Sequence, residues 1–341
     1  MSPPVNASPH IPENPIVATI DFDADGIQHG FLKLPHSTDA SAWGAVMIPV
    51  MVAKRGTGPT ALLTGANHGD EYEGPIALLD LARHLDISKV SGRIIAVPFM
   101  NQPAFAAGRR TSPLDGGNMN RIFPGRPGGS PTQKIADYFK SRLLPMADVV
   151  LDIHSGGRTL EFLPFAAAHE LDDAEHQARC VAAMTAFNAP YSVMMRELDA
   201  AGMYDTAAEA QGKTFVTTEL GGGGTTTAKT IAIAKRGVAN LLMHAGILEG
   251  TPVMAPSTRL VMPGDDCFVT AERAGLVEFC ADLGEAVTAG DTVVRVHDVS
   301  RTDAGARDYA AAMDGIVAGR HFPGLVQAGD TLCVIATPET G

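Results

Sequence analysis

One stretch of the chain places a histidine and a carboxylate three residues apart. It reads Thr64-Gly-Ala-Asn-His68-Gly-Asp-Glu71-Tyr-Glu73-Gly74 and directly follows an apolar run. A histidine and a glutamate at this spacing can supply two ligands to one metal ion. A catalytic zinc usually takes three protein ligands and keeps a fourth position for water. The motif therefore predicts a metal site that needs one more ligand from elsewhere in the chain.

The best candidate for the third ligand is His154, which ends the apolar run 149–153 and precedes Ser-Gly-Gly. Two histidines and a glutamate suit zinc acting as a Lewis acid and as activator of a bound water, whose pKa can fall to about 7. Asp152 could instead orient a ligand histidine from behind. The alternative without a metal is a loop hydrogen bond between His68 and Glu71 and a core histidine at 154.

A hydrolytic metal site also needs a base, and Glu219 is the candidate. It follows a third apolar run in Thr217-Thr-Glu-Leu-Gly-Gly222. We expect its carboxylate to take a proton from the attacking water and to pass it to the leaving amine. A carboxylate also favours the first turn of a helix, so Glu219 could instead simply begin one.

Two arginine-containing segments suggest substrate recognition. Asn120-Arg121 would bind a substrate carboxylate, because the planar guanidinium matches a carboxylate in shape and a neighbouring amide can add a bond. Either Arg110 or Arg109 would polarise the scissile carbonyl, and the other would support binding. Glu161 could meet an amino group of the substrate or form a surface ion pair.

The elements that must position these residues alternate along residues 60–250. Apolar runs at 61–64, 93–98, 147–153 and 214–218 predict strands, and the pattern at 74–84 predicts a helix. This alternation is typical of an α/β fold with a largely parallel sheet flanked by helices, in which ligands collect at the carboxyl ends of the strands. We assign residues 16–250 to a catalytic domain with N-terminal strands at 16–53, preceded by an extended arm at 1–15.

Residues 251–341 consist of short strand-like runs separated by turn residues, and they contain an internal repeat. Residues 287–296 resemble 326–335, each with a Gly-Asp pair suited to a tight turn, and 274–277 resemble 314–317. Two such halves resemble the barrel-sandwich hybrid of biotinyl and lipoyl domains. No lysine occupies a hairpin tip between them, so a structural or oligomerising β domain is expected and not a carrier of a covalent cofactor.

Composition narrows the possible partners. The 341 residues are 45% hydrophobic, and 26 Lys and Arg against 38 Asp and Glu give a net charge of −12. The charge and the lack of basic runs argue against nucleic acid as a partner. Neither a signal peptide nor a membrane span is evident, so a cytoplasmic protein is expected. Four widely spaced cysteines indicate reduced thiols.

The chain resembles the succinylglutamate desuccinylase/aspartoacylase family, which is related to the zinc carboxypeptidases. The resemblance rests on His68-x-x-Glu71, Asn120-Arg121, His154 and Glu219. The resemblance spans about residues 45–250 and extends to the family's β-rich C-terminal region. It implies one Zn²⁺ per subunit on His68, Glu71 and His154, with Glu219 as base. It also implies a substrate carboxylate on Asn120 and Arg121, and a homodimer. The segment before Asn120 is longer than in aspartoacylase, so the resemblance does not assign the carbonyl-polarising role to one of Arg109 and Arg110.

Within that family the chain is most similar to the bacterial N-acetyl-diaminobutyrate deacetylases of ectoine breakdown. Three segments carry this resemblance: 65–75, 118–125 and 217–222. It implies hydrolysis of N2-acetyl-L-2,4-diaminobutanoate to diaminobutanoate and acetate, with ectoine hydrolase as a partner. The alternatives are a succinylglutamate desuccinylase or aspartoacylase, a metallocarboxypeptidase, and a non-catalytic binding protein.

Overall fold

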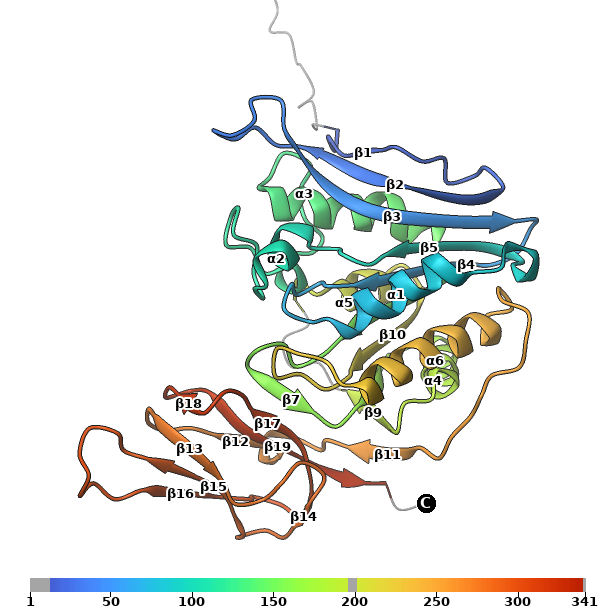
Figure 1. Ribbon diagram of the computed structural model, residues 1–341. Helices are drawn as coiled ribbons and strands as arrows, with labels where there is room; N and C mark the ends of the chain where they lie inside the picture. Colours follow the sequence, from blue (N-terminus) through green and yellow to red (C-terminus); the bar gives the residue numbers. More distant parts are fainter. Residues whose placement is uncertain (1–12, 196–200, 340–341) are drawn as a thin grey trace, which may run out of the picture.

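The computed structural model describes residues 13–195 and 201–339 as a large mixed sheet flanked by helices, with a smaller antiparallel sheet in the C-terminal part (Figure 1). The predicted α/β class with a β-rich C-terminal region is confirmed. Most of the predicted arm, residues 1–12, lies outside the described residues. Its last part is attached to the body, because the Asn14 side chain donates to the backbone oxygen of Lys134 and to the Asp137 carboxylate.

The large sheet runs across the whole described chain. In spatial order its strands are β1 (Val17–Ala18), β2 (Gly26–Pro35), β3 (Ala45–Arg55), β5 (Gly92–Val97), β4 (Thr60–Gly65), β6 (Val149–His154), β10 (Thr214–Glu219), β8 (Phe165–His169), β9 (Tyr191–Met195), β11 (Thr258–Val261), β19 (Thr331–Pro338), β17 (Gly315–His321) and β14 (Ala286–Val287), with β12 (Phe268–Thr270) pairing with β19 and β7 (Leu160–Phe162) pairing with β17.

The centre of this sheet is parallel. Strand β4 pairs in parallel with β5 and β6, and β6 pairs in parallel with β10. All residues of β4 and β6 are buried, as expected for strands covered on both faces. The apolar runs therefore predict these strands correctly. The outer strands β1 to β3 are antiparallel and extend the same sheet, because β3 pairs with β5.

Helices cover both faces of the sheet. They are α1 (Glu73–His84), α2 (Gln102–Ala107), α3 (Pro131–Tyr138), α4 (Ala174–Phe187), α5 (Tyr204–Glu209) and α6 (Ala228–His244). Helix α6 packs against both α1 and α4, and these three helices share one apolar core, whereas α3 and α5 belong to a second core with β2 and β3. Helix α1 begins one residue before the predicted position and ends where predicted.

The C-terminal repeat is visible in the structure. Each half has a strand, a two-residue strand and a second long strand: β13 (Gly275–Phe279), β14 and β15 (Thr292–His297) in the first, and β17, β18 (Leu325–Val326) and β19 in the second. Gly290 and Gly329 occupy equivalent turns at φ +98° and +96°, a region that favours glycine. Strand β16 (Arg307–Ala310) completes a four-stranded sheet with β15, β13 and β18.

The C-terminal part is joined to the catalytic part by backbone pairing. The predicted boundary at residue 251 falls in a connection without helix or strand between α6 and β11. Strand β11 nevertheless pairs with β9 on one side and β19 on the other. No helix in the described residues has both the length and the apolarity to cross a membrane. All four cysteines are free thiols.

Candidate metal centre

The carboxyl ends of β4, β6 and β10 bring the predicted site residues together. His154 is the last residue of β6 and Glu219 the last of β10, and the two are directly paired in the parallel ladder. His68 and Glu71 lie in the connection from β4 to α1, and the end of β4 is paired with the residues just before His154. Parallel neighbouring strands end at the same edge, so residues that follow them in sequence meet in space.

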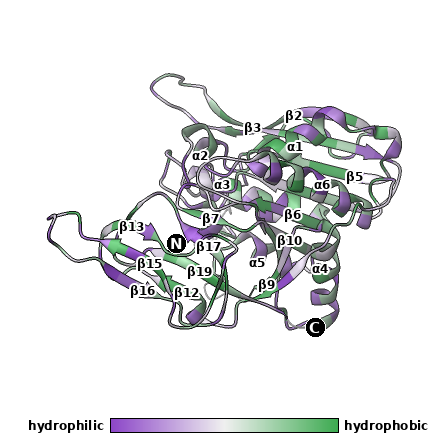
Figure 2. Cartoon of the chain, turned by 60° about the horizontal axis from the view of Figure 1, so that its bottom comes forward, coloured by the Kyte–Doolittle hydropathy of each residue, from purple (hydrophilic) through white to green (hydrophobic). Residues whose placement is uncertain are grey.

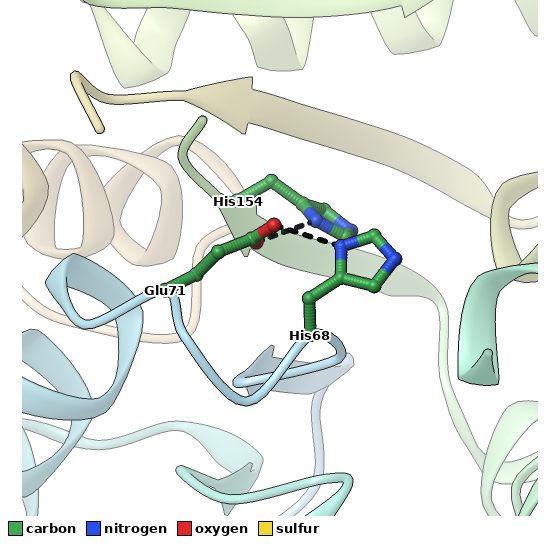
Figure 3. A group of neighbouring side chains, drawn as sticks. All are labelled: His68, Glu71 and His154. Atoms are coloured by element: carbon green, nitrogen blue, oxygen red, sulfur yellow. Dashed lines mark hydrogen bonds and ion pairs between the residues drawn. The ribbon is translucent and has the colours of Figure 1, made fainter. Parts of the chain in front are cut away.

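The side chains of His68, Glu71 and His154 converge on one point (Figure 3). Glu71 Oε1 lies 2.7 Å from His68 Nδ1, and its Oε2 lies 2.8 Å from His154 Nδ1. All three residues are buried, and one ligand atom from each falls within 4.8 Å of the others. Two imidazole nitrogens and a carboxylate oxygen are ligands that divalent metal ions accept, so the residues present fit a metal ion.

Each imidazole is fixed by a second hydrogen bond on its Nε2 atom. His154 Nε2 lies 2.8 Å from Asp152 Oδ2, and His68 Nε2 lies 3.1 Å from Asn118 Oδ1. That Asn118 atom also accepts the backbone N–H of Asn120, which identifies it as the oxygen. Both partners only accept, so both Nε2 atoms donate. The Nδ1 lone pairs are then left for a metal.

Asp152 is itself held from the other side. Its carboxylate accepts hydrogen bonds from Thr64 Oγ1 at 2.7 Å and Asn67 Nδ2 at 2.8 Å. Thr64 is the second-to-last residue of β4, and Asn67 directly precedes His68 in the connection that follows, so the Asp152 carboxylate joins β6 to β4 and to the loop with the other two candidate ligands. The prediction that Asp152 orients a ligand histidine agrees with these contacts, while its role stays a prediction.

The loop that carries His68 and Glu71 packs tightly on α2. A Cβ atom at Gly69 would lie 2.0 Å from the backbone carbon of Ala104 and 2.2 Å from the nitrogen of Phe105. Any side chain at this position would push the loop off the helix. A glycine is therefore required between the two candidate ligands.

Without a metal, the charges of His68, Glu71 and His154 shift one another's pKa values. Burial opposes ionisation of Glu71, but His68 and His154 outweigh it and lower the pKa of that carboxyl. Burial lowers the pKa of His68. Burial also acts against the charge of His154, but Asp152 and Glu71 overcome it and raise its pKa well above the usual value. Without a metal, the two neighbouring carboxylates therefore favour a positive charge on His154.

Glu219, a partly buried acid, lies beside this cluster, and its electrostatic partners include Glu71 and His154. Burial, and then the negative charge of Glu71, raise the pKa of Glu219 to about 8. Its Oε2 atom has no hydrogen-bond partner among the described residues. Glu73 lies nearby in the first turn of α1, accepts a hydrogen bond from Thr230 Oγ1 at 3.0 Å, and has its pKa raised by burial to about 7. Glu219 does not begin a helix, because it ends β10.

The structure separates the two adjacent arginines. Arg110 is half-exposed, and its Nη1 atom lies 3.7 Å from Glu71 Oε1 at the centre of the site. Arg109 is exposed, and among the described residues no ion pair joins its side chain to the three candidate ligands. Between the two, Arg110 is therefore the one that reaches the candidate metal ligands.

Asn120 and Arg121 lie in a short turn between α2 and α3. Asn120 is buried, and its side-chain oxygen accepts the backbone N–H of Tyr204 at 2.9 Å. Its backbone oxygen accepts a hydrogen bond from Arg121 Nη1 at 2.7 Å. The side-chain oxygen of Asn120 is thus engaged in the fold, and a bond to a substrate carboxylate would come from its amide nitrogen, because only the nitrogen donates. Asn120 can support Arg121 through its backbone oxygen.

The sequence did not predict the contact of Asn118 with His68, and it left two alternatives for Glu161, a substrate amine or a surface ion pair. The only signal for Asn118 was its position two residues before Asn120, and its contact with His68 joins residues 50 positions apart. Glu161, one strand beyond His154, accepts bonds to its Oε2 from Arg320 Nε at 2.9 Å and Nη2 at 2.8 Å. Glu161 forms an ion pair with the C-terminal part, which favours the surface ion pair over an amine contact.

Comparison with known proteins adds a family and relatives of nearly full length. The family model described as the succinylglutamate desuccinylase/aspartoacylase catalytic domain matches residues 57–245. An N-alpha-acetyl-L-2,4-diaminobutyric acid deacetylase of Halomonas elongata is 58% identical over 325 residues, which cover 95% of this chain and 95% of that protein.

Solved structures match the same span. The product-bound ectoine utilization protein EutE (DoeB) of Ruegeria pomeroyi has 58% identity and a TM-score of 0.94, covering 96% of this chain and 100% of the other. A succinylglutamate desuccinylase of Silicibacter sp. TM1040 has 57% identity and a TM-score of 0.94 over the same shares of both chains. Similarity over nearly the whole chain includes both the candidate metal centre and the C-terminal sheets.

Proposed function

The chain belongs to the succinylglutamate desuccinylase/aspartoacylase family, and we propose that it is a zinc-dependent deacetylase of N2-acetyl-L-2,4-diaminobutanoate. It is a hydrolase of N-acyl amino acids, as its family and relatives are. The assignment of this substrate rests on the 58% identity, over 95% of both chains, to a deacetylase of that compound. The products are 2,4-diaminobutanoate and acetate, which places the reaction in ectoine degradation.

The proposed metal ligands are His68 Nδ1, the Glu71 carboxylate and His154 Nδ1. Two histidines and a glutamate form a donor set that catalytic zinc commonly takes, and this supports Zn²⁺, one per subunit, over Mg²⁺ or Ca²⁺, which prefer oxygen ligands. When bound, zinc supplies a Lewis acid for the amide carbonyl and lowers the pKa of a coordinated water to about 7.

Glu219 is the proposed base. Its carboxylate takes a proton from the attacking water and returns it to the amide nitrogen as the carbon–nitrogen bond breaks, so acetate and a free amine leave. A base must be ionised, yet burial raises the pKa of Glu219 to about 8 without a metal. A cation held by Glu71 and His154, which both act on Glu219 electrostatically, favours its ionised form.

The arginines are proposed to stabilise the developing oxyanion and to bind the substrate carboxylate. Arg110, close to Glu71, is the proposed donor to the negative oxygen that develops on the amide carbonyl. Arg121, Arg109 and the amide nitrogen of Asn120 are the proposed partners of the substrate carboxylate, and Arg121 is held by the 2.7 Å bond to the backbone oxygen of Asn120. A cytoplasmic location, a homodimer and association with ectoine hydrolase belong to the same proposal and rest on family resemblance.

A second candidate has its own support. The relative from Silicibacter sp. TM1040, described as a succinylglutamate desuccinylase, is 57% identical over nearly the same span. The same metal centre and Glu219 would then act on a succinyl group, whose extra carboxylate needs a further cation near the pocket.

The test is an assay of metal-stripped and zinc-restored protein on N2-acetyl-2,4-diaminobutanoate, N-succinylglutamate, N-acetylaspartate and a peptide. We expect zinc to restore hydrolysis of the first compound with the highest kcat/KM. Glu219→Gln should keep its zinc and lose about 100-fold or more in kcat. The exposed Glu249→Gln, the same chemical change elsewhere, should match the wild type. Full activity in Glu219→Gln would refute the proposed base, and a preference for N-succinylglutamate would select the second candidate.

A further inference from the structure

Four consecutive glycines, residues 221–224, begin two positions after the proposed base Glu219. Each has a positive φ, at +99°, +144°, +70° and +66° in order, and we call them the glycine run. This part of backbone space favours glycine, because other residues rarely adopt it. Glycine also loses the most conformational freedom when it is ordered, so the run needs contacts along its length to keep one course.

The backbone of residues 156–162, just after His154, holds one edge of the glycine run. Two N–H groups of this segment donate to the Gly221 oxygen, each at 3.0 Å. Gly223 donates in turn to the Leu160 oxygen at 3.0 Å. The loop after a proposed metal ligand and the run after the proposed base are therefore bonded to each other.

The same segment is bonded to the C-terminal part. Strand β7 pairs with β17, and the next residue after β17, Phe322, donates its N–H to the Thr159 oxygen at 2.8 Å. In two views β7 lies between the catalytic part and the C-terminal sheets (Figures 1 and 2). The backbone of the C-terminal part thus reaches the loop that carries one edge of the glycine run.

The ring of Phe322 covers the side of Gly223 from which a side chain would project. A Cβ atom there would lie 3.4 Å from Cε2 and 3.5 Å from Cδ2 and Cζ of the ring, and these are its three nearest neighbours apart from the adjoining residues. The nearest atoms at the other three glycines belong to Thr230, Leu160 and Arg158, all in the catalytic part. Within the run, Gly223 is therefore the position that the C-terminal part covers.

Core packing does not explain this ring. Phe322 is 39% exposed, whereas side chains that form the apolar core of the C-terminal part, such as Leu332 and Val294, are fully buried. A ring left partly in water contributes less to stability than a buried one. Its position beside the glycine run points to a role in the neighbouring site.

We propose that Phe322 is a positioning residue for the base. Its ring restrains Gly223, and the glycine run passes this restraint to Glu219, whose carboxylate must stay within about 0.5 Å of its productive position. Without the ring, one side of Gly223 opens and the run gains freedom, so the carboxylate spends less time where it can act. The inference rests on the proposed role of Glu219, and it gives the C-terminal part a share in catalysis beyond a structural one.

The first test is the activity of Phe322→Ala in the zinc-loaded full chain, on the acyl amino acid that the wild type hydrolyses fastest. We expect kcat to fall about 10-fold, because a misplaced base slows the chemical step, with KM within about twofold. Phe322→Tyr keeps the ring and should retain the wild-type kcat. Phe268→Ala is the matched control, since Phe268 lies in the same part and is 40% exposed.

A double variant separates positioning from general damage. In Glu219→Gln the base is gone, so Phe322 has nothing left to position. Adding Phe322→Ala should then leave the residual kcat unchanged, whereas independent effects would multiply.

Hydrogen–deuterium exchange of the metal-free chain gives a readout that does not depend on activity or zinc. We expect the amides of residues 219–224 to exchange about 10-fold faster in Phe322→Ala, and at the wild-type rate in Phe322→Tyr and Phe268→Ala. Phe322→Leu, which covers Gly223 less well than the ring does, should show a smaller increase and replaces the alanine variant if that one does not fold.

Three results would overturn the proposal while leaving the proposed function intact, provided that Glu219→Gln itself is inactive. These are a wild-type kcat in Phe322→Ala, unchanged exchange of residues 219–224, and a double variant that loses a further 10-fold in kcat. Full activity of Glu219→Gln would instead refute the proposed base, and this inference with it.

Discussion

The rings of His68 and His154 are each held at both nitrogens, and this decides which atom can bind a metal. Their Nε2 atoms donate to Asn118 and Asp152, and their Nδ1 atoms face the two oxygens of Glu71. A ligand fixed in its tautomer and orientation loses little freedom when the metal binds. The supporting residues should therefore matter to metal affinity almost as much as the ligands.

The first prediction concerns Asp152. Replacing it by alanine removes the acceptor for His154 Nε2 and leaves the Thr64 hydroxyl and Asn67 amide without their partner. We expect zinc affinity to fall by about 10- to 100-fold, measured by competition with a chelating dye. Asp148→Ala, an exposed aspartate just before the same strand, is the control. Equal affinity of Asp152→Ala and wild type would show that His154 needs no such support.

The second prediction concerns the pH dependence of the metal-free protein. Burial raises the pKa of Glu219 to about 8 and that of Glu73 to about 7, from 4.5 in an unfolded chain. At a pH between the unfolded and the folded pKa, each carboxyl keeps a proton in the folded state that it has released in the unfolded state, so the free energy of unfolding falls as pH rises. For each such proton the free energy of unfolding falls by about 1.4 kcal/mol per pH unit.

Thermal unfolding of the chelated protein should therefore show Tm falling from about pH 5 to about pH 8. In Glu219→Gln, which has no proton to lose at this position, the slope should be shallower. Glu249→Gln, at an exposed position, should keep the wild-type slope. A Tm that rises over this range would contradict the assigned direction of the shift.

At the scale of elements, helices α4 and α6 approach unusually closely over the sheet. The ring of Phe187, fully buried at the end of α4, lies directly against Gly237 in α6. A Cβ atom at Gly237 would lie 2.3 Å from the ring. Glycine normally weakens a helix interior, so its presence here reflects the need for close contact.

The third prediction follows from that contact. Gly237→Ala should destabilise the protein by about 1 to 3 kcal/mol, because the overpacking outweighs the gain in helix propensity. Urea unfolding measures the loss. Gly305→Ala is the control, since a Cβ atom there meets nothing within 4 Å. A more stable Gly237→Ala would mean that Phe187 can move aside without cost.

At the scale of the whole molecule, one sheet passes from the catalytic part into the C-terminal part. A small apolar cluster at the junction joins Phe165 and Val193 on one side to Ala318 and Ala336 on the other, with Leu260 of β11 between them. The Glu161–Arg320 ion pair lies across the same boundary. The two parts should therefore unfold together.

The fourth prediction tests this coupling. Leu260→Ala empties a fully buried position and should cost about 2 to 5 kcal/mol. Calorimetry should show one transition that moves to lower temperature as a whole. Leu276→Ala, at an exposed leucine of the C-terminal sheet, is the control and should leave the transition in place. Two separate transitions in Leu260→Ala, with the upper one unchanged, would show independent domains.

The amino-acid sequence by itself determined the strands and the residues that follow them. Buried parallel strands are continuous apolar runs, so the positions of β4, β6 and β10 were readable. His154 ends one of these runs and Glu219 follows another. Because the carboxyl ends of neighbouring parallel strands meet, order along the chain was enough to predict which side chains gather.

Only the tertiary structure decided the contacts that depend on packing between distant segments. Asn118 reaches His68 across 50 positions, and Thr230 reaches Glu73 across 157. Arg110 and Arg109 are adjacent and chemically identical, so only the direction in which the backbone presents them makes Arg110 the one that lies near Glu71. Local patterns carry no information on such directions, because burial and side-chain orientation arise when the whole chain packs.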